Sequence, residues 1–207
     1  MKYEIDDDGN IRLKAILIGD SGVGKTNLIN ISAGKEFDIN EKVSVNASFF
    51  RKQFDIDGKT YNIYLWDTIG QEKLRSLTKL FFKNSKIVIF VYDITQKSTF
   101  IGLNTWYEEV KQELGDDIIK GVVGNKQDLF MKEDVEDEEG KKYAESINAK
   151  FRLTSAKADA EGFINFLELL LKEYINKNGK KPKVNDNIKL VSENHQMKNT
   201  KNKRGFC

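Results

Sequence analysis

The chain has 207 residues, of which 39% are hydrophobic and 32% are charged, and its net charge is +2. This length fits a single α/β domain with a proper core. The single cysteine excludes an intramolecular disulfide framework, so we expect a reducing compartment. One histidine and one cysteine are also too few for a His- or Cys-rich zinc site. His195 lies in a polar tail, which argues against a Ser-His-Asp triad, and we expect neither a secretory signal nor a membrane span.

The first half of the chain predicts three strands and one helix. Residues 11–18 form a β-rich run that ends in glycine, and residues 25–33 are typical of a helix. Residues 46–56 and 61–66 are two strand candidates. They are joined by Asp57-Gly58, which is a hairpin signal.

The second half alternates strands with helices. The short apolar runs are typical of parallel strands buried on both faces, and they lie at residues 87–91, 118–123 and 151–153. Three stretches predict helices, and they span residues 98–114, 135–147 and 163–175. Ser98 is the predicted N-cap of the first helix. The pattern predicts an α/β fold with a six-stranded, mainly parallel sheet, one antiparallel strand and helices on both faces.

Charge divides the chain into a mildly acidic body and a basic tail. We expect an N-terminal extension at residues 1–10, the domain at residues 11–178 and a disordered tail at residues 179–207. The tail holds eight basic and two acidic residues, a net charge of +6, against −4 for the rest. A basic tail on an acidic body does not predict nucleic-acid binding. It suits an anionic membrane surface, although a solvated terminus without a role explains the charge equally well.

Residues 19–26, Gly-Asp-Ser-Gly-Val-Gly-Lys-Thr, match the phosphate-loop motif G-x-x-x-x-G-K-[ST]. The motif follows a predicted strand and opens a predicted helix, which is the context it requires. Its glycines let successive backbone N–H groups face one anion, and the helix N-terminus adds positive potential. Lys25 can reach the β- and γ-phosphates and the Thr26 hydroxyl can bind Mg²⁺, so we expect a P-loop NTPase.

Asn125-Lys126-Gln127-Asp128 follows a predicted buried strand and predicts which base is bound. The Asp128 carboxylate can accept both N1–H and the exocyclic amino group of guanine, whereas adenine presents an acceptor there. In isolation this motif is equally consistent with a polar loop. Two further segments at strand ends argue against the polar-loop interpretation, and they are Asp67-Thr68-Ile69-Gly70-Gln71 and Thr154-Ser155-Ala156-Lys157. Asp67 can hold Mg²⁺ beside the phosphate loop, and Gly70 can present its N–H to a γ-phosphate.

With these four motifs in this order, the chain resembles the Rab family of small Ras-like GTPases over residues 11–178. Further Rab-like segments lie at residues 66–72, 81–85 and 91–95. No extra helix is predicted between Asn125 and Ser155, which argues against the Rho branch, and Lys2 argues against the myristoylated Arf branch.

The resemblance implies a monomeric switch that binds GTP with Mg²⁺, slowly hydrolyses it to GDP, and recruits effectors in vesicle traffic. The implied partners are an exchange factor, an activating protein, effectors and a prenyl-binding chaperone. The implied location is the cytoplasmic face of an endomembrane, with cycling to the cytosol.

The resemblance also assigns roles to residues. Asp67 would hold the metal together with Thr26 and Ser44, Gly70 would sense the γ-phosphate and Gln71 would orient the attacking water. The phosphates would be wrapped by Asp20, Ser21, Gly22, Val23, Gly24, Lys25, Thr26 and Asn27. The base would be contacted by Phe37, Asn125, Lys126, Asp128, Ser155, Ala156 and Lys157.

Some positions depart from the family pattern. Residues 44–49 read Ser-Val-Asn-Ala-Ser-Phe where the family has T-I-G-V-D-F, and Ile69 replaces alanine. These changes predict that the loop containing residues 44–49, the first switch loop, is looser than in the family and that the protein binds unusual effectors. They leave open the alternative that the protein is a GTP-binding scaffold with impaired switching. Gln71 and residues 125–128, the guanine motif, argue against another P-loop enzyme, such as a nucleotide kinase.

Cys207 stands alone at the C-terminus, where Rab proteins commonly carry two prenylated cysteines. One lipid chain with a basic segment would give reversible membrane attachment. The alternative is an ordinary terminal thiol.

Overall fold

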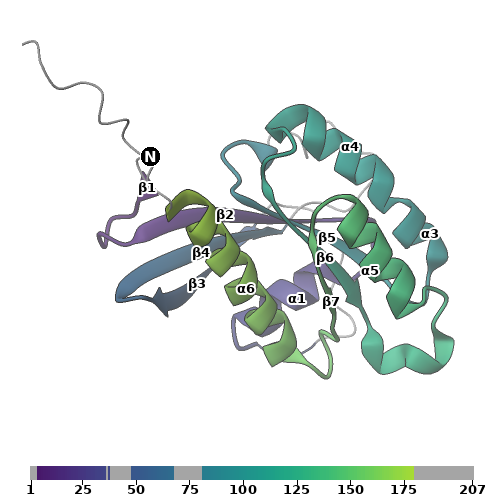
Figure 1. The fold of residues 1–207 in the computed structure, drawn as a ribbon. Helices are drawn as coiled ribbons and strands as arrows, with labels where there is room; N and C mark the ends of the chain where they lie inside the picture. The colour runs from purple at the N-terminus through teal and green to yellow at the C-terminus, as the bar shows by residue number, and fades with distance from the viewer. Residues whose placement is uncertain (1–3, 36, 38–47, 68–80, 180–207) are drawn as a thin grey trace, which may run out of the picture.

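The computed structural model describes residues 4–35, 37, 48–67 and 81–179. Within them a seven-stranded sheet runs through the molecule (Figure 1). Six strands follow the order β3-β4-β2-β5-β6-β7, and β1 pairs with β2 off this path. The strands are β1 (Glu4–Ile5), β2 (Ile11–Ile18), β3 (Ser48–Ile56), β4 (Lys59–Asp67), β5 (Ile87–Asp93), β6 (Ile119–Asn125) and β7 (Lys150–Leu153).

The main sheet confirms the predicted arrangement of six strands. β2 pairs in parallel with β4 and β5, β5 with β6, and β6 with β7. β3 pairs antiparallel with β4 through the predicted hairpin. Asp57 and Gly58 both have positive φ, 50° and 72°, which a tight hairpin turn of two residues requires.

The seventh strand, β1, lies within the segment expected to be an N-terminal extension. It pairs antiparallel with the start of β2, and the turn between them is organised by the Asp6 carboxylate. One Asp6 oxygen accepts the N–H groups of Asp8 and Asn10, and the other accepts the amide of Asn62 on β4 at 2.6 Å. The sheet therefore begins before Ile11.

Helices cover both faces of the sheet (Figure 1). α1 (Lys25–Ser32) and α6 (Ala160–Gly179) pack on one face. α4 (Leu103–Leu114) and α5 (Asp137–Ser146) pack on the other, and α3 (Lys97–Ile101) precedes α4. Alternate residues of β5 face each layer, so the whole strand is buried, as its apolar run predicts.

The helix predicted from residue 98 differs in two details. It is divided at Gly102 into α3 and α4, and Ser98 is not its N-cap, because α3 begins at Lys97 after Gln96. The Asp134 carboxylate accepts the Lys97 N–H at 2.9 Å, so a residue distant in sequence caps this helix. In contrast, α5 carries a local capping box between Glu136 and Glu139.

No helix within the described ranges is long and apolar enough to cross a membrane. Residues 180–207, which include most of the predicted tail and Cys207, lie outside the described residues.

Candidate functional site

The predicted motifs follow the carboxyl ends of parallel strands, which meet at one edge of the sheet. The loop after β2 carries residues 19–24, and the guanine motif begins at the last residue of β6. The loop after β7 carries residues 154–159, and Asp67 ends β4. This edge is where open parallel sheets place their ligands.

The phosphate loop is shaped by glycine at two close approaches. Gly19 has φ of 145°, and a Cβ built there would lie 2.1 Å from the Val91 carbonyl oxygen. Gly24 has φ of 96° and is the N-cap of α1, and a Cβ there would lie 2.4 Å from the Asn125 amide nitrogen. Side chains at these two positions would force β5 or the guanine motif away from the loop.

Lys25 is buried beneath the phosphate loop. Its ammonium donates to the carbonyl oxygens of Gly19 and Asp20, each at 2.8 Å. Burial lowers its pKa to about 8, although the carboxylates of Asp67 and Asp20 act in the opposite direction. The loop therefore holds a desolvated cation that an anionic ligand would stabilise.

The Asp20 carboxylate is held by α4. The indole N–H of Trp106 donates to Asp20 Oδ1 at 2.8 Å, and Gly102 lies so close that a Cβ there would be 2.8 Å from Asp20 Oδ2. Asp20 thus contributes its backbone carbonyl to Lys25 while its side chain fixes the loop against the neighbouring helix.

Thr26 and Asp67 form a pair of hard oxygen donors. The Thr26 hydroxyl donates to Asp67 Oδ2 at 2.7 Å, and Asp67 is buried. Hydroxyl and carboxylate oxygens beside a phosphate site are the ligands that Mg²⁺ prefers, so these residues fit the ion. In the described part of the chain, no group of three or more His, Cys, Asp or Glu side chains is placed to hold a metal ion.

Asn125 joins three loops in one buried hydrogen-bond network. Its side-chain amide donates to the Val23 carbonyl of the phosphate loop at 2.8 Å. Its carbonyl oxygen accepts the backbone N–H of Ala156 at 3.1 Å. Since Asn125 is only 1% exposed, the loss of either bond would leave a buried polar group unsatisfied.

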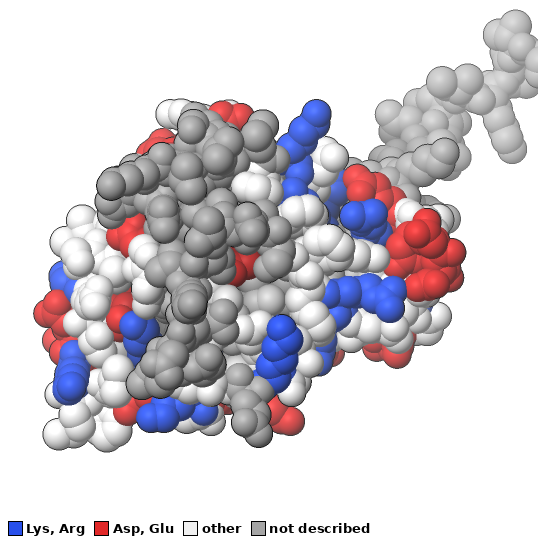
Figure 2. All heavy atoms as spheres, turned by 180° about the vertical axis from the view of Figure 1, so that it is seen from behind, with Lys and Arg blue, Asp and Glu red and all other residues white. Residues whose placement is uncertain are grey.

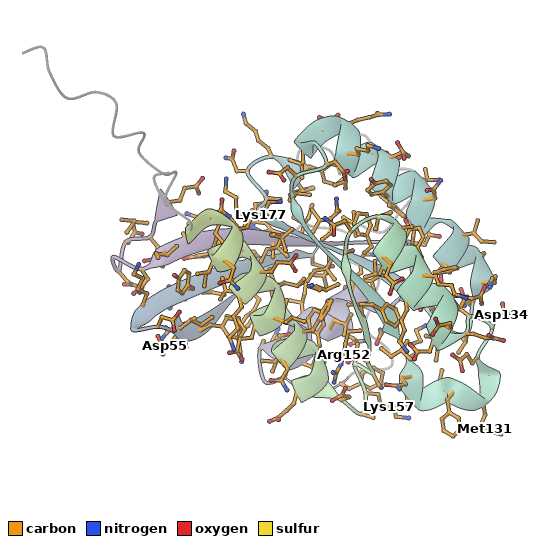
Figure 3. All side chains as sticks on the ribbon, in the orientation of Figure 1. Asp55, Met131, Asp134, Arg152, Lys157 and Lys177 are labelled. Carbon is orange, nitrogen blue, oxygen red and sulfur yellow. The ribbon has the colours of Figure 1, made fainter. Side chains whose placement is uncertain are left out.

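Asp128 is oriented from the loop after β7. Its Oδ1 accepts the Ser155 hydroxyl at 2.5 Å, and the Ser155 oxygen in turn accepts the backbone N–H groups of Lys157 and Ala158. A carboxylate oxygen has a second lone pair, so Asp128 keeps acceptor capacity for a ligand. The Lys157 side chain is exposed, and it lies at the same end of the molecule as Met131 (Figure 3).

Several predicted site residues remain to be placed. Phe37 is partly buried and packs against the core cluster beneath α1 and α6. Ser21 and Gly22 are exposed in the loop, and Asn27 lies in the first turn of α1. Ser44, Gly70, Gln71 and Cys207 lie outside the described residues.

Sequence reasoning missed two side chains that hold the site. Trp106 lies in the helix predicted at residues 98–114 and was given no part in the site, yet its indole N–H reaches the phosphate loop. Asp93 is paired with Lys126, their charged atoms 2.6 Å apart. Its position at the end of a buried strand, like that of Asp67, was the signal that could have revealed it.

Charge is mixed on the face of the molecule seen from behind the view of Figure 1. Figure 2 shows the largest group of acidic atoms at one end of that face, further acidic atoms around it, and basic side chains in separate groups. The visible described surface there carries no continuous basic field.

Comparison with known proteins agrees with this geometry. The Ras family model matches residues 14–175. Ras-related protein RABA1b of Arabidopsis thaliana is 36% identical over 172 residues, covering 83% of this chain and 80% of that protein. Ras-related protein YPTC6 of Chlamydomonas reinhardtii is 30% identical over 214 residues, covering 100% of this chain and 99% of that protein. Ras-related protein Rab11E of Lotus japonicus is 36% identical over 154 residues, covering 74% of this chain and 71% of that protein.

The fold and the sequence match define a P-loop GTPase. The chain belongs to the Ras family and, within it, to the Rab family of small GTPases. It is accordingly a GTP-binding enzyme of a family that acts in membrane traffic.

Proposed function

We propose that this GTPase is a two-state switch that binds effectors in its GTP form on the cytoplasmic face of an endomembrane. The observation that supports nucleotide binding, on which the switch depends, is the Asn125 network, which ties the phosphate loop to the loops after β6 and β7. A guanine nucleotide would span these loops, with its phosphates at Lys25 and its base at Asp128. An exchange factor would load GTP and an activating protein would end the signal.

At the phosphate end, the N–H groups of residues 20–27 and the Lys25 ammonium would surround the phosphates. Thr26 and Ser44 would hold Mg²⁺, and Asp67, whose carboxylate accepts the Thr26 hydroxyl, would hold the ion from its second shell. The ion would neutralise phosphate charge when bound. Lys25 is already hydrogen-bonded in place, so little reorganisation is needed for it to meet an anion.

At the base end, the Asp128 carboxylate would accept the two adjacent donors of guanine. The Ala156 N–H, which donates to Asn125, would be shared with the guanine carbonyl. The stems of Lys126 and Lys157 would cover the faces of the base, and Phe37 would contact its edge.

For hydrolysis, Gln71 would orient the attacking water and the Gly70 N–H would meet the γ-phosphate. Intrinsic turnover should be slow, about 10⁻⁴–10⁻³ per second, and an arginine from an activating protein would raise it about 10³–10⁵-fold. Loss of the γ-phosphate would release both switch loops.

Membrane attachment would come from a prenyl group on Cys207 together with the +6 tail. A prenyl-binding chaperone would return the monomer to the cytosol. Mass spectrometry of the protein from its native cell tests the modification.

The switch is tested by single-turnover phosphate release and by hydrogen exchange of the GTP- and GDP-bound forms. We expect slow release that Gln71→Leu abolishes, and greater protection of residues 38–47 and 68–80 with GTP. Gln71→Leu, held in the GTP state, is the matched control for protection. Equal protection in both forms would contradict the switch and support the scaffold alternative.

A further inference from the structure

Asp93 is a buried carboxylate at the edge of the guanine motif. It is the last residue of β5 and pairs with Asn125 in the parallel register of β5 and β6. Its Oδ1 accepts the backbone N–H and the hydroxyl of Thr95, at 2.9 and 2.7 Å. Its Oδ2 lies 2.6 Å from the Lys126 ammonium. Both oxygens are therefore engaged, and the carboxylate is fixed in one orientation.

Lys126 lies between two side chains that are themselves fixed. Asn125 precedes it and is held by its buried network, and Asp128 follows and is held by Ser155. Lys126 has φ of 70°, a left-handed conformation that is unfavourable for a residue with a Cβ. This backbone conformation sets the direction in which the side chain leaves the backbone, and the ion pair with Asp93 holds its far end.

The two partners differ in exposure, which separates their roles. The Asp93 side chain is 2% exposed, whereas that of Lys126 is 31% exposed. A ligand can thus touch the Lys126 stem but cannot reach Asp93. A free lysine stem has four rotatable bonds and would lose their freedom on binding, so an anchor at its ammonium removes that cost in advance.

We propose that Asp93 is a positioning residue for the guanine nucleotide, because it holds the Lys126 stem where it covers the base. This inference rests on the proposed function. The loss of the anchor would speed dissociation of GDP and GTP alike. It would leave hydrolysis of bound GTP unchanged, since the γ-phosphate lies at the other end of the ligand.

The test is a double-mutant cycle that follows release of fluorescent GDP from the full chain. Asp93→Asn keeps the shape of the side chain and an acceptor for Thr95 but removes the charge opposite Lys126. Lys126→Met keeps an apolar stem but cannot be anchored. We expect each variant to release GDP about tenfold faster, which is about 1.4 kcal/mol, and the double variant to match the single ones. Thr95→Val, which leaves the ion pair, is the matched control and should change release less than threefold.

Several results would overturn the inference. An unchanged release rate in Asp93→Asn would do so, and so would additive effects in the double variant, since these indicate independent structural damage. A changed rate of single-turnover hydrolysis in Asp93→Asn would also contradict it. If a lone buried charge unfolds a single variant, the double variant still decides, because it removes both charges and should release GDP about tenfold faster than the wild type.

Failure of the proposed function has a different signature. A wild-type chain that retains no GDP would refute guanine-nucleotide binding and this inference with it. Retention of GDP by the wild type with no acceleration in the variants would refute the role of Asp93 alone.

Discussion

The buried ammonium of Lys25 predicts an unusual dependence of stability on pH in the nucleotide-free protein. Burial lowers its pKa to about 8 in the folded chain, from the ordinary value of 10.5. Between these two values the unfolded chain binds more protons than the folded one. The free energy of unfolding should therefore rise with pH across this window.

The size of the effect follows from the two pKa values. Integration from about pH 7.5 to about pH 9.5 gives a gain of about 2 kcal/mol. The window must end below pH 10, because burial also raises the pKa values of Tyr92 and Tyr143. Above pH 10 these phenols ionise in the unfolded chain first, which lowers stability again.

The assay is urea unfolding of the nucleotide-free protein at several pH values in this window. Lys25→Met keeps the apolar stem but cannot titrate, so it is the matched control. Burial also lowers the pKa of Lys14, but this contribution is the same in both proteins and cancels in the comparison. Bound GDP should abolish the gain, because its phosphates keep Lys25 charged. If wild type and Lys25→Met gained equally from pH 7.5 to 9.5, the reasoning about the buried ammonium would be refuted.

Two further predictions concern the packing of the phosphate loop. Gly19→Ala should cost about 3 kcal/mol or more in urea unfolding, because its Cβ would meet the Val91 carbonyl at 2.1 Å. Gly22→Ala is the control, because nothing lies within 4 Å of a Cβ built at that position. Only the left-handed φ of 80° opposes this change, so we expect it to cost about 1–2 kcal/mol. Equal losses of stability in the two variants would contradict the steric argument. Trp106→Phe should cost about 1.5–3 kcal/mol by removing the bond to the Asp20 carboxylate, and a change below 0.5 kcal/mol would show that this bond contributes little.

Much of the fold could be predicted because its signals are local. The apolar run of β5 and the Asp57-Gly58 turn each fix one element from adjacent residues, and the structure has both. β1 was not predicted, since a strand of two residues has no periodicity. Its pairing is accompanied by a contact between Asp6 and Asn62, which are 56 positions apart.

The candidate site shows the same division. The phosphate loop and the guanine motif were found because each is a short segment with a fixed spacing. The contacts that join them are long-range, with 102 positions between Asn125 and Val23 and 86 between Trp106 and Asp20. The first N–H of α3, that of Lys97, is capped by Asp134, which is 37 positions away. The sequence-based prediction of Ser98 as the N-cap was therefore wrong. Such contacts depend on the sheet order, which no local pattern contains.

The most direct measurement is nucleotide competition by GTP, ATP and XTP on the wild type and on Asp128→Asn. The wild type should prefer GTP to ATP strongly, because a carboxylate held by Ser155 accepts two adjacent donors of guanine. Asp128→Asn should prefer XTP, since an amide donor then faces the additional carbonyl of xanthine. Equal competition by ATP and GTP on the wild type would contradict guanine recognition at this site.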